Sequence, residues 1–206
     1  MRTAKIFQPK DIEGLGEFIR QQPLASLVSC LADDIEATPL PLLAELDPEG
    51  NVVTLVGHMV RSNRHVEMLE QSPRAIAVFL GAHGHISPSW MRDRTQAPTW
   101  NFETAHFVVD VSFAHTQDET AEAVARLLDA MEEGRPNRWH SSELGPRYDQ
   151  LIKHIVGFKA KVVDARIKFK LGQNERADVY EDILSGLEGT GEIGLADAMR
   201  RQADGR

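Results

Sequence analysis

The order of the predicted helices and strands constrains the fold of this chain more than any other feature. Apolar, strand-like segments dominate the first half of the chain, two helices follow, and a long strand and a short helix come last. A doubly wound parallel sheet requires strands and helices in regular alternation, which this order lacks. The sequence therefore predicts an α+β fold: an antiparallel barrel or sheet with peripheral helices.

Local signals give the limits of these elements. The predicted strands cover residues 24–31, 35–46, 52–58, 75–80, 102–115 and 155–171. The predicted helices cover residues 10–22, 62–71, 143–153 and 177–187, with a further helix between Thr116 and Gly134. Thr116 and Glu119 form a capping box at the start of that helix. The prolines within residues 35–46 are typical of an edge strand.

Three segments are predicted to lack regular structure. A Gly-rich turn follows residue 80, residues 85–101 form a loop, and the polar, Gly-rich end of the chain forms a mobile tail. We therefore divide the chain into a barrel domain over residues 1–176 and a C-terminal helix with its tail over residues 177–206.

Charge and cysteine content exclude several kinds of site. The 206 residues include 31 Asp and Glu against 23 Lys and Arg, and the net charge of -8 argues against direct DNA binding. The single Cys30 excludes an internal disulfide and every Cys-rich zinc site, and its apolar neighbours predict a buried, unreactive thiol. The chain shows no signal-peptide pattern and no apolar run of membrane-spanning length, so we expect a cytoplasmic protein without membrane contact.

A phosphate site is predicted where the strand at residues 52–58 passes into the helix at residues 62–71. A helix N-terminus offers free backbone N–H groups, and Arg61 adds a forked cation beside Ser62 and Asn63. A helix capped by Ser62 and preceded by a surface arginine fits the same residues, so spacing leaves both interpretations open.

A second cationic group lies in the last predicted strand. Arg166, Lys168 and Lys170 alternate there and so project from one face. Like charges side by side either meet an anion or carboxylates, or protect an exposed edge strand from aggregation. Two cationic features facing one groove favour a ligand with a single phosphate over a nucleic-acid strand.

The predicted loop brings hydroxyl, amide and indole groups together. Its side chains include Ser89, Trp90, Thr99, Trp100 and Asn101. An indole offers a planar heterocycle a flat stacking wall with one N–H donor, and it equally suits a core or a subunit interface.

No catalytic or metal motif stands out by spacing. His83 and His85 would face the same way on a strand, but no third ligand stands at a diagnostic distance and no carboxylate flanks them, so we predict no metal site. The sequence contains no Ser–His–Asp order, Walker loop or dinucleotide-binding glycine motif. Spacing therefore identifies no catalytic residue.

Taken together, several segments resemble the PaiB family of FMN-binding, transcriptional-regulator-like proteins. They occur in the order typical of that family, which makes the resemblance much more specific than any single motif. The segments are PLASLVS (23–29), PLPLL (39–43), GHMVRSN (57–63), AVFLGAHGHISPSWM (77–91), PTWNF (98–102), IVGF (155–158) and KFKLGQN (168–174).

This resemblance implies an FMN-binding split β-barrel that forms a homodimer, with the flavin at the subunit interface. The loop at residues 85–101 and the strand at residues 102–115 are the expected interface. Arg61 would hold the flavin phosphate and Lys170 would supply a second cation. The residues expected to bind the cofactor are Arg61, Ser62, Asn63, Ser89, Trp90, Thr99, Asn101, Lys170 and Gln173.

Other functions remain open beside flavin binding. The family name implies a transcriptional regulator, and the acidic balance with no convincing helix-turn-helix favours indirect action through a partner or small molecule. A flavin-dependent NAD(P)H oxidoreductase is compatible, because the cofactor itself supplies the hydride chemistry. A split-barrel dimer that has lost flavin binding fits the same fold.

Overall fold

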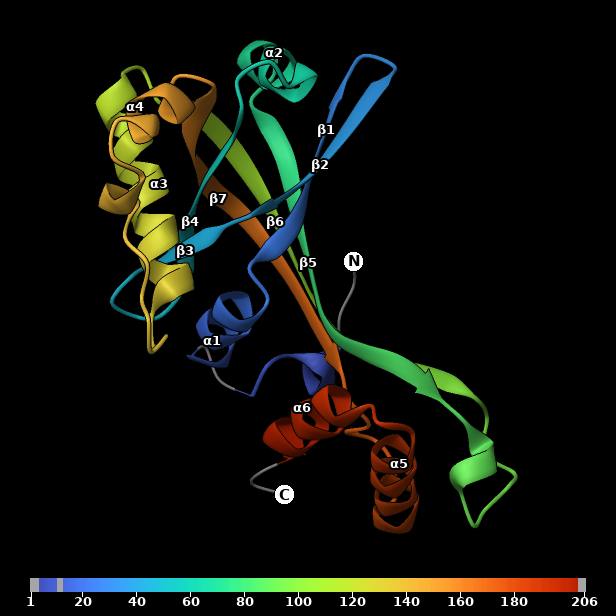
Figure 1. Cartoon of the computed structure of the whole chain (residues 1–206). Helices are drawn as coiled ribbons and strands as arrows, with labels where there is room; N and C mark the ends of the chain where they lie inside the picture. Colours follow the sequence, from blue (N-terminus) through green and yellow to red (C-terminus); the bar gives the residue numbers. More distant parts are fainter. Residues whose placement is uncertain (1–3, 11–12, 204–206) are drawn as a thin grey trace. The chain divides into compact units, whose positions relative to one another are not determined.

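The computed structural model describes residues 4–10 and 13–203 and confirms the α+β fold. The strands are β1 (Leu24–Leu31), β2 (Asp34–Pro41), β3 (Leu43–Leu46), β4 (Val52–Val60), β5 (Arg74–Ile86), β6 (Thr99–Phe113) and β7 (Ile155–Lys170). The helices are α1 (Glu13–Gln21), α2 (Arg64–Gln71), α3 (Gln117–Glu132), α4 (Arg147–Ile152), α5 (Ala177–Thr190) and α6 (Ile193–Ala203). Short 3-10 helices are η1 (Lys5–Phe7), η2 (Pro88–Trp90) and η3 (Ser141–Leu144). One sheet contains all of these strands, in the order β2-β1-β5-β6-β7-β4-β3 (Figure 1).

One continuous segment of chain forms both edges of this sheet. β2 pairs antiparallel with β1 at one edge, β3 pairs antiparallel with β4 at the other, and Leu42 alone separates β2 from β3. A single residue cannot bridge two distant edges, so the sheet must curl until β2 meets β4, and these two strands are indeed in contact. The predicted edge strand over residues 35–46 is thus two edge strands, and the antiparallel split barrel is confirmed.

The barrel lies in a compact unit formed by residues 15–79 and 106–165. Leu27 and Leu55 are fully buried in it, and the rings of Phe79 and Phe107 meet edge-on with their centroids 5.8 Å apart. On each of these strands the buried apolar residues largely alternate with more exposed ones. The alternation visible in the sequence therefore determines which face of the sheet turns inward.

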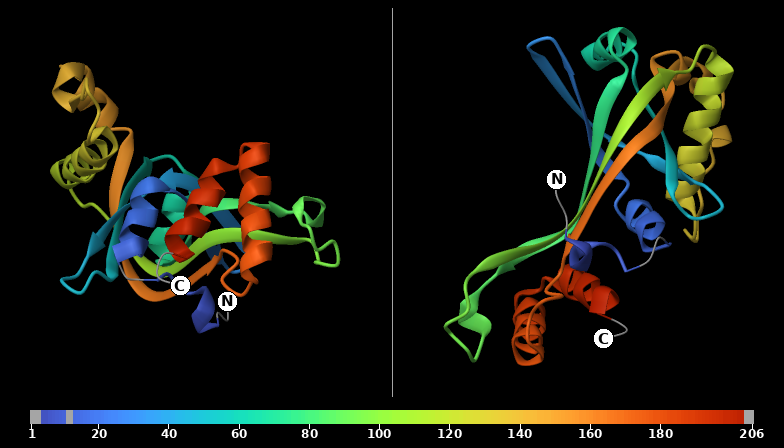
Figure 2. Two further views of the ribbon diagram at one scale, coloured as in Figure 1. Left: turned by 90° about the horizontal axis from the view of Figure 1, so that it is seen from below. Right: turned by 180° about the vertical axis from the view of Figure 1, so that it is seen from behind.

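Helix α3 packs against β3 and β4 of the same unit (Figure 2). Its predicted capping box is confirmed: Glu119 N donates to Thr116 Oγ1 at 3.1 Å, and Thr116 N donates to Glu119 Oε2 at 3.3 Å. Gly157 N donates to Thr120 Oγ1 at 3.2 Å, and a Cβ on Gly157 would lie 3.0 Å from Thr120 Cα. A glycine at this position therefore lets the helix approach β7 closely.

The second compact unit consists, among the described residues, of 4–10, 13–14, 80–105 and 166–203. In this unit β5 continues as far as Ile86, so the predicted Gly-rich turn after residue 80 is wrong. The physical reason is visible at Gly84, where a Cβ would lie 2.9 Å from Leu195 Cδ2. The glycine allows a helix to pack on the strand and does not mark a turn.

Helix α6 occupies the segment that the sequence predicted to be a mobile tail. Leu195 and Met199, one helical turn apart, are 2% and 0% exposed. Two such residues within a polar, Gly-rich segment form too weak a pattern to predict a helix from sequence. Packing against the rest of the unit supplies the stability that local propensity lacks.

Two smaller predictions also differ from the structure. Helix α2 begins at Arg64 and is capped by Asn63, not by Ser62. Cys30 is exposed, because the alternation of β1 turns it outward, where it lies opposite the exposed Ile35 of β2.

Candidate functional site

Arg61 stands at the predicted junction between β4 and α2, within the barrel unit. Its backbone N–H donates to His154 O at 2.8 Å, and its guanidinium donates to Ile155 O at 3.0 Å. The side chain is exposed and forms no ion pair with any residue that the structure describes, whereas the nearby Arg64 is paired with Asp34. Arg61 is therefore held by the backbone of β7 while most of its N–H donors face outward.

Asn63 ties the start of α2 to the β1–β2 hairpin. Its Oδ1 accepts a hydrogen bond from His65 N at 2.9 Å, and its Nδ2 donates to Thr38 Oγ1 at 3.2 Å. Ser62 is exposed between Arg61 and this cap. Arg61 precedes the first residue of α2 by three positions, so one short segment carries both a cation and the positive end of a helix dipole, and both favour an anion.

The structure adds one residue that sequence reasoning missed, His65. It is fully buried, with Nε2 2.8 Å from Ser29 Oγ and Nδ1 2.9 Å from Thr38 Oγ1. Burial lowers the pKa of His65, and the nearby Glu36 carboxylate opposes this effect in part. Its place beside Val66 on the buried face of α2 is the one sequence signal that could have revealed it.

The stability of the fold is expected to fall as the pH drops below about 6.5. Unfolded histidine takes up a proton near pH 6.5, while burial lowers the pKa of both His65 and His58 in the fold. Below that pH the unfolded chain binds more protons than the folded one, so acid favours unfolding. Urea denaturation of the wild type and of His65→Gln at several pH values measures the effect.

The variant is expected to show a smaller loss of unfolding free energy between neutral and mildly acidic pH than the wild type. His115→Gln, at an exposed position, is the matched control and should retain the wild-type dependence. An unchanged pH dependence in His65→Gln would contradict a buried neutral imidazole.

The predicted residues outside 61–63 lie in the other compact unit, and two of them, Lys170 and Thr99, meet there. The Lys170 ammonium donates to Thr99 Oγ1 and, at 2.9 Å, to Trp100 O. Burial and the neighbouring Lys168 lower the pKa of Lys170, while Glu175 raises it. Lys168 itself lies 5.6 Å from the Phe102 ring centroid. Lys170 is thus fixed beside Thr99 and retains a further N–H for a ligand.

Trp90 and Asn101 contact helices of their own unit. A Cβ on Gly186 of α5 would lie 2.4 Å from Trp90 Cδ2, so the indole packs directly against that glycine. Asn101 is 2% exposed, and its Nδ2 donates to Met199 Sδ at 3.5 Å. Both residues hold α5 and α6 in place.

Gln173 and Ser89 make mainly local hydrogen bonds. Leu171 N donates to Gln173 Oε1 at 2.7 Å, which stabilises the turn that follows β7. Ser89 Oγ is exposed and lies 2.8 Å from Ser87 Oγ. Ser89 therefore remains accessible to a ligand, whereas Gln173 shapes the end of the strand.

Two further observations bear on the kind of site. Within residues 4–10 and 13–203, no three His, Cys, Asp or Glu side chains gather as a metal site would need. In the same residues no helix is long and apolar enough to cross a membrane.

Comparison with known proteins gives a consistent result. The model of a family described as "Putative FMN-binding domain" matches residues 1–164. PaiB of Bacillus subtilis strain 168, named "Protease synthase and sporulation protein PAI 2", is 29% identical over 189 residues, which cover 91% of this chain and 89% of that protein. An uncharacterized protein of Aspergillus fumigatus is 22% identical, over 92% of this chain and 93% of its own.

Solved structures show the same fold at low sequence identity. The FAD and heme binding protein from Mycobacterium smegmatis aligns with a TM-score of 0.62 and 17% identity, over 87% of this chain and 80% of that one. The flavocytochrome Anf3 from Azotobacter vinelandii aligns with a TM-score of 0.58 and 16% identity, over 77% of this chain and 67% of that one. The fold, the ordered PaiB-like segments and the match to the family model over most of the chain agree, and this protein therefore belongs to the family of FMN-binding domains that includes PaiB.

Proposed function

We propose that this protein binds FMN and that Arg61, with the start of α2, holds the flavin phosphate. The observation that carries the proposal is the state of Arg61: its position is fixed by Ile155 O, yet no described carboxylate neutralises it. A phosphate monoester carries up to about two negative charges near neutral pH and accepts forked donors well. The family to which the chain belongs supports the choice of FMN.

The chemistry of the other available donors also fits this cofactor. Ser62 and Ser89 offer exposed hydroxyls, and Lys170 keeps a donor beside Thr99. In the barrel unit we assign Ser62, with Arg61, to direct contact with the flavin. In the other unit, described by itself, we assign Ser89 and Lys170 to ligand binding and Trp90, Asn101 and Gln173 to positioning, since these last three already have partners in the protein. When bound, FMN supplies hydride and one-electron transfer chemistry.

Titration of the purified protein with FMN tests the proposal. We expect flavin absorbance to remain with the protein through gel filtration and to saturate at one flavin per chain. Complete separation of the flavin from the protein, at micromolar concentrations of both, would contradict the proposal that this protein binds FMN.

We also propose that the protein is a homodimer with the flavin at the subunit interface. The outward face of β2, β1 and β5 in the barrel unit is mostly apolar, and its charged residue Arg74 is paired with Asp110 of the neighbouring β6. Val28 lies opposite both Ala37 of β2 and Ile76 of β5, and Ile35 at its border is 69% exposed. The face adjoins β6, the strand that the sequence suggested as interface. A second copy would cover this apolar surface by twofold symmetry.

Sedimentation at micromolar concentration should show the mass of two chains, and Ile35→Glu should shift the protein toward the monomer, because the dimer would have to bury the new charge. Val163→Glu, at an apolar position that is 50% exposed on β7, is the control and should leave the mass unchanged. A wild-type monomer of 23.0 kDa would overturn this proposal.

The name of the Bacillus relative concerns protease synthesis and sporulation. For this chain we propose an indirect regulatory role, exerted through the flavin or a protein partner. The net charge of -8 repels the DNA backbone, which supports an indirect route over direct DNA contact.

A further inference from the structure

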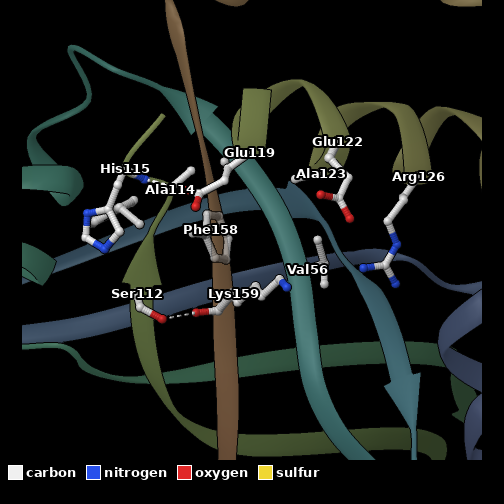
Figure 3. A pocket seen from close by; sticks show the side chains of 12 residues that line it. Val56, Ser112, Ala114, His115, Glu119, Glu122, Ala123, Arg126, Phe158 and Lys159 are labelled. Atoms are coloured by element: carbon white, nitrogen blue, oxygen red, sulfur yellow. Dashed lines mark hydrogen bonds between the residues drawn. The ribbon is translucent and has the colours of Figure 1, made fainter. Parts of the chain in front are cut away.

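A cavity of about 340 Å³ lies beside α3, within the barrel unit (Figure 3). This volume is at the lower end of the range of small-molecule pockets, about 300–1,000 Å³. Val56 of β4, Ala123 of α3 and Phe158 of β7 form its almost fully buried floor. The half-buried Phe113 and Ala114, at the end of β6, offer the accessible apolar surface. The cavity can therefore take a small apolar group.

Two of the charged side chains around the cavity are already engaged by the protein. Arg126 donates to Glu45 Oε1 at 2.6 Å. Glu119 accepts from His115 N at 2.6 Å and from Thr116 N, and these backbone hydrogen bonds lower the pKa of its carboxyl group. These groups shape the cavity but have little capacity left for a ligand.

One cation and one carboxylate at the cavity remain without such a partner. The Lys159 ammonium and the Glu122 carboxylate form no ion pair or hydrogen bond with the residues that the structure describes, although the charge of Lys159 contributes to the lowered pKa of Glu119. Figure 3 shows Glu122 extending from α3 and Lys159 extending from β7 toward the same open space. A complementary ligand carries a negative and a positive group close together, next to an apolar group.

We propose that this cavity binds a free α-amino acid with an apolar side chain. Lys159 binds the ligand carboxylate, Glu122 binds its ammonium group, and the side chain packs against Phe113 and Ala114. None of the residues assigned above to FMN lines this cavity. The site is therefore a second one, and it would allow an amino acid to influence a flavin-binding protein.

Isothermal titration calorimetry with L-leucine tests the site. We expect saturable binding, and about tenfold weaker binding of 4-methylpentanoate, which lacks the ammonium group, and of 3-methylbutylamine, which lacks the carboxylate. Glycine, without an apolar side chain, should bind more weakly as well. Equal binding of leucine and either truncated analogue would overturn the zwitterion assignment, and no binding of leucine at millimolar concentration would overturn the site.

Surface variants identify the two contacts without disturbing the core. Lys159→Met should weaken leucine and 4-methylpentanoate but not the amine, and Glu122→Gln should weaken leucine and the amine but not the acid. Lys161→Met and Asp118→Asn, exposed neighbours that do not line the cavity, are the matched controls and should bind leucine as the wild type does.

Experiments with FMN distinguish this site from the flavin site. Neither Lys159→Met nor Glu122→Gln should change FMN affinity, and FMN should not displace leucine. Displacement of leucine by FMN, or variants with unchanged leucine affinity, would contradict the proposal of a second site. Failure to bind FMN alone would concern the proposed function and leave the leucine result intact.

Discussion

Replacing Arg61 with alanine is expected to weaken FMN binding by about 10–150-fold, because a charge-assisted hydrogen bond to phosphate is typically worth about 1.5–3 kcal/mol. Riboflavin has the same ring system but no phosphate, so its affinity should change little. Arg61→Lys keeps the charge and loses the forked geometry, and it should give an intermediate loss. Fluorescence quenching of FMN and of riboflavin measures both affinities.

Arg64→Ala is the matched control, since Arg64 lies three residues further on and is already paired with Asp34. It should alter FMN affinity much less than Arg61→Ala does. Equal losses for FMN and riboflavin in Arg61→Ala would mean that Arg61 acts on the fold or on the ring. Unchanged affinity for both would make Arg61 an ordinary surface residue.

Replacing Gly186 with alanine is expected to destabilise the protein by about 1–3 kcal/mol, since overpacking a tight contact costs this much. The new Cβ would lie 2.4–2.5 Å from three ring atoms of Trp90, including Cγ at the base of the indole. The ring therefore has to leave its place against α5. Urea denaturation measures the loss, and tryptophan emission should change because Trp90 is displaced.

Gly189→Ala separates this clash from the general preference of helices for alanine. Gly189 lies on the same helix, and a Cβ there would meet no atom within 4 Å. It should leave stability unchanged or raise it by up to about 1 kcal/mol, the usual gain of alanine over glycine in a helix. Equal stability of Gly186→Ala and Gly189→Ala would contradict the direct packing of Trp90 on α5.

Features decided by near neighbours in the chain were predictable from sequence. The capping box of Thr116 and Glu119 needs side chains only three residues apart, and the structure contains it. The alternation that buries Leu27 and Phe107 is likewise a property of each strand alone. Arg61 was found in the same way, as a cation between a strand and a helix cap.

Features decided by distant segments were not predictable in this way. His65 obtains its partners Ser29 and Thr38 from positions 36 and 27 residues earlier in the chain. The cavity beside α3 takes its lining from β4, β6, α3 and β7, and no spacing along the chain relates these segments. No periodicity within one element specifies which other element it will face.

The sequence by itself therefore determined most of the elements up to residue 187 and the alternation that turns one side of each strand inward. The tertiary structure alone decided that residues 34–46 close a barrel through Leu42, that Leu195 packs directly on Gly84, and that the end of the chain is helical. The physical reason is that propensity and alternation act over a few residues, whereas closure, close packing and burial depend on contacts between segments far apart in the chain.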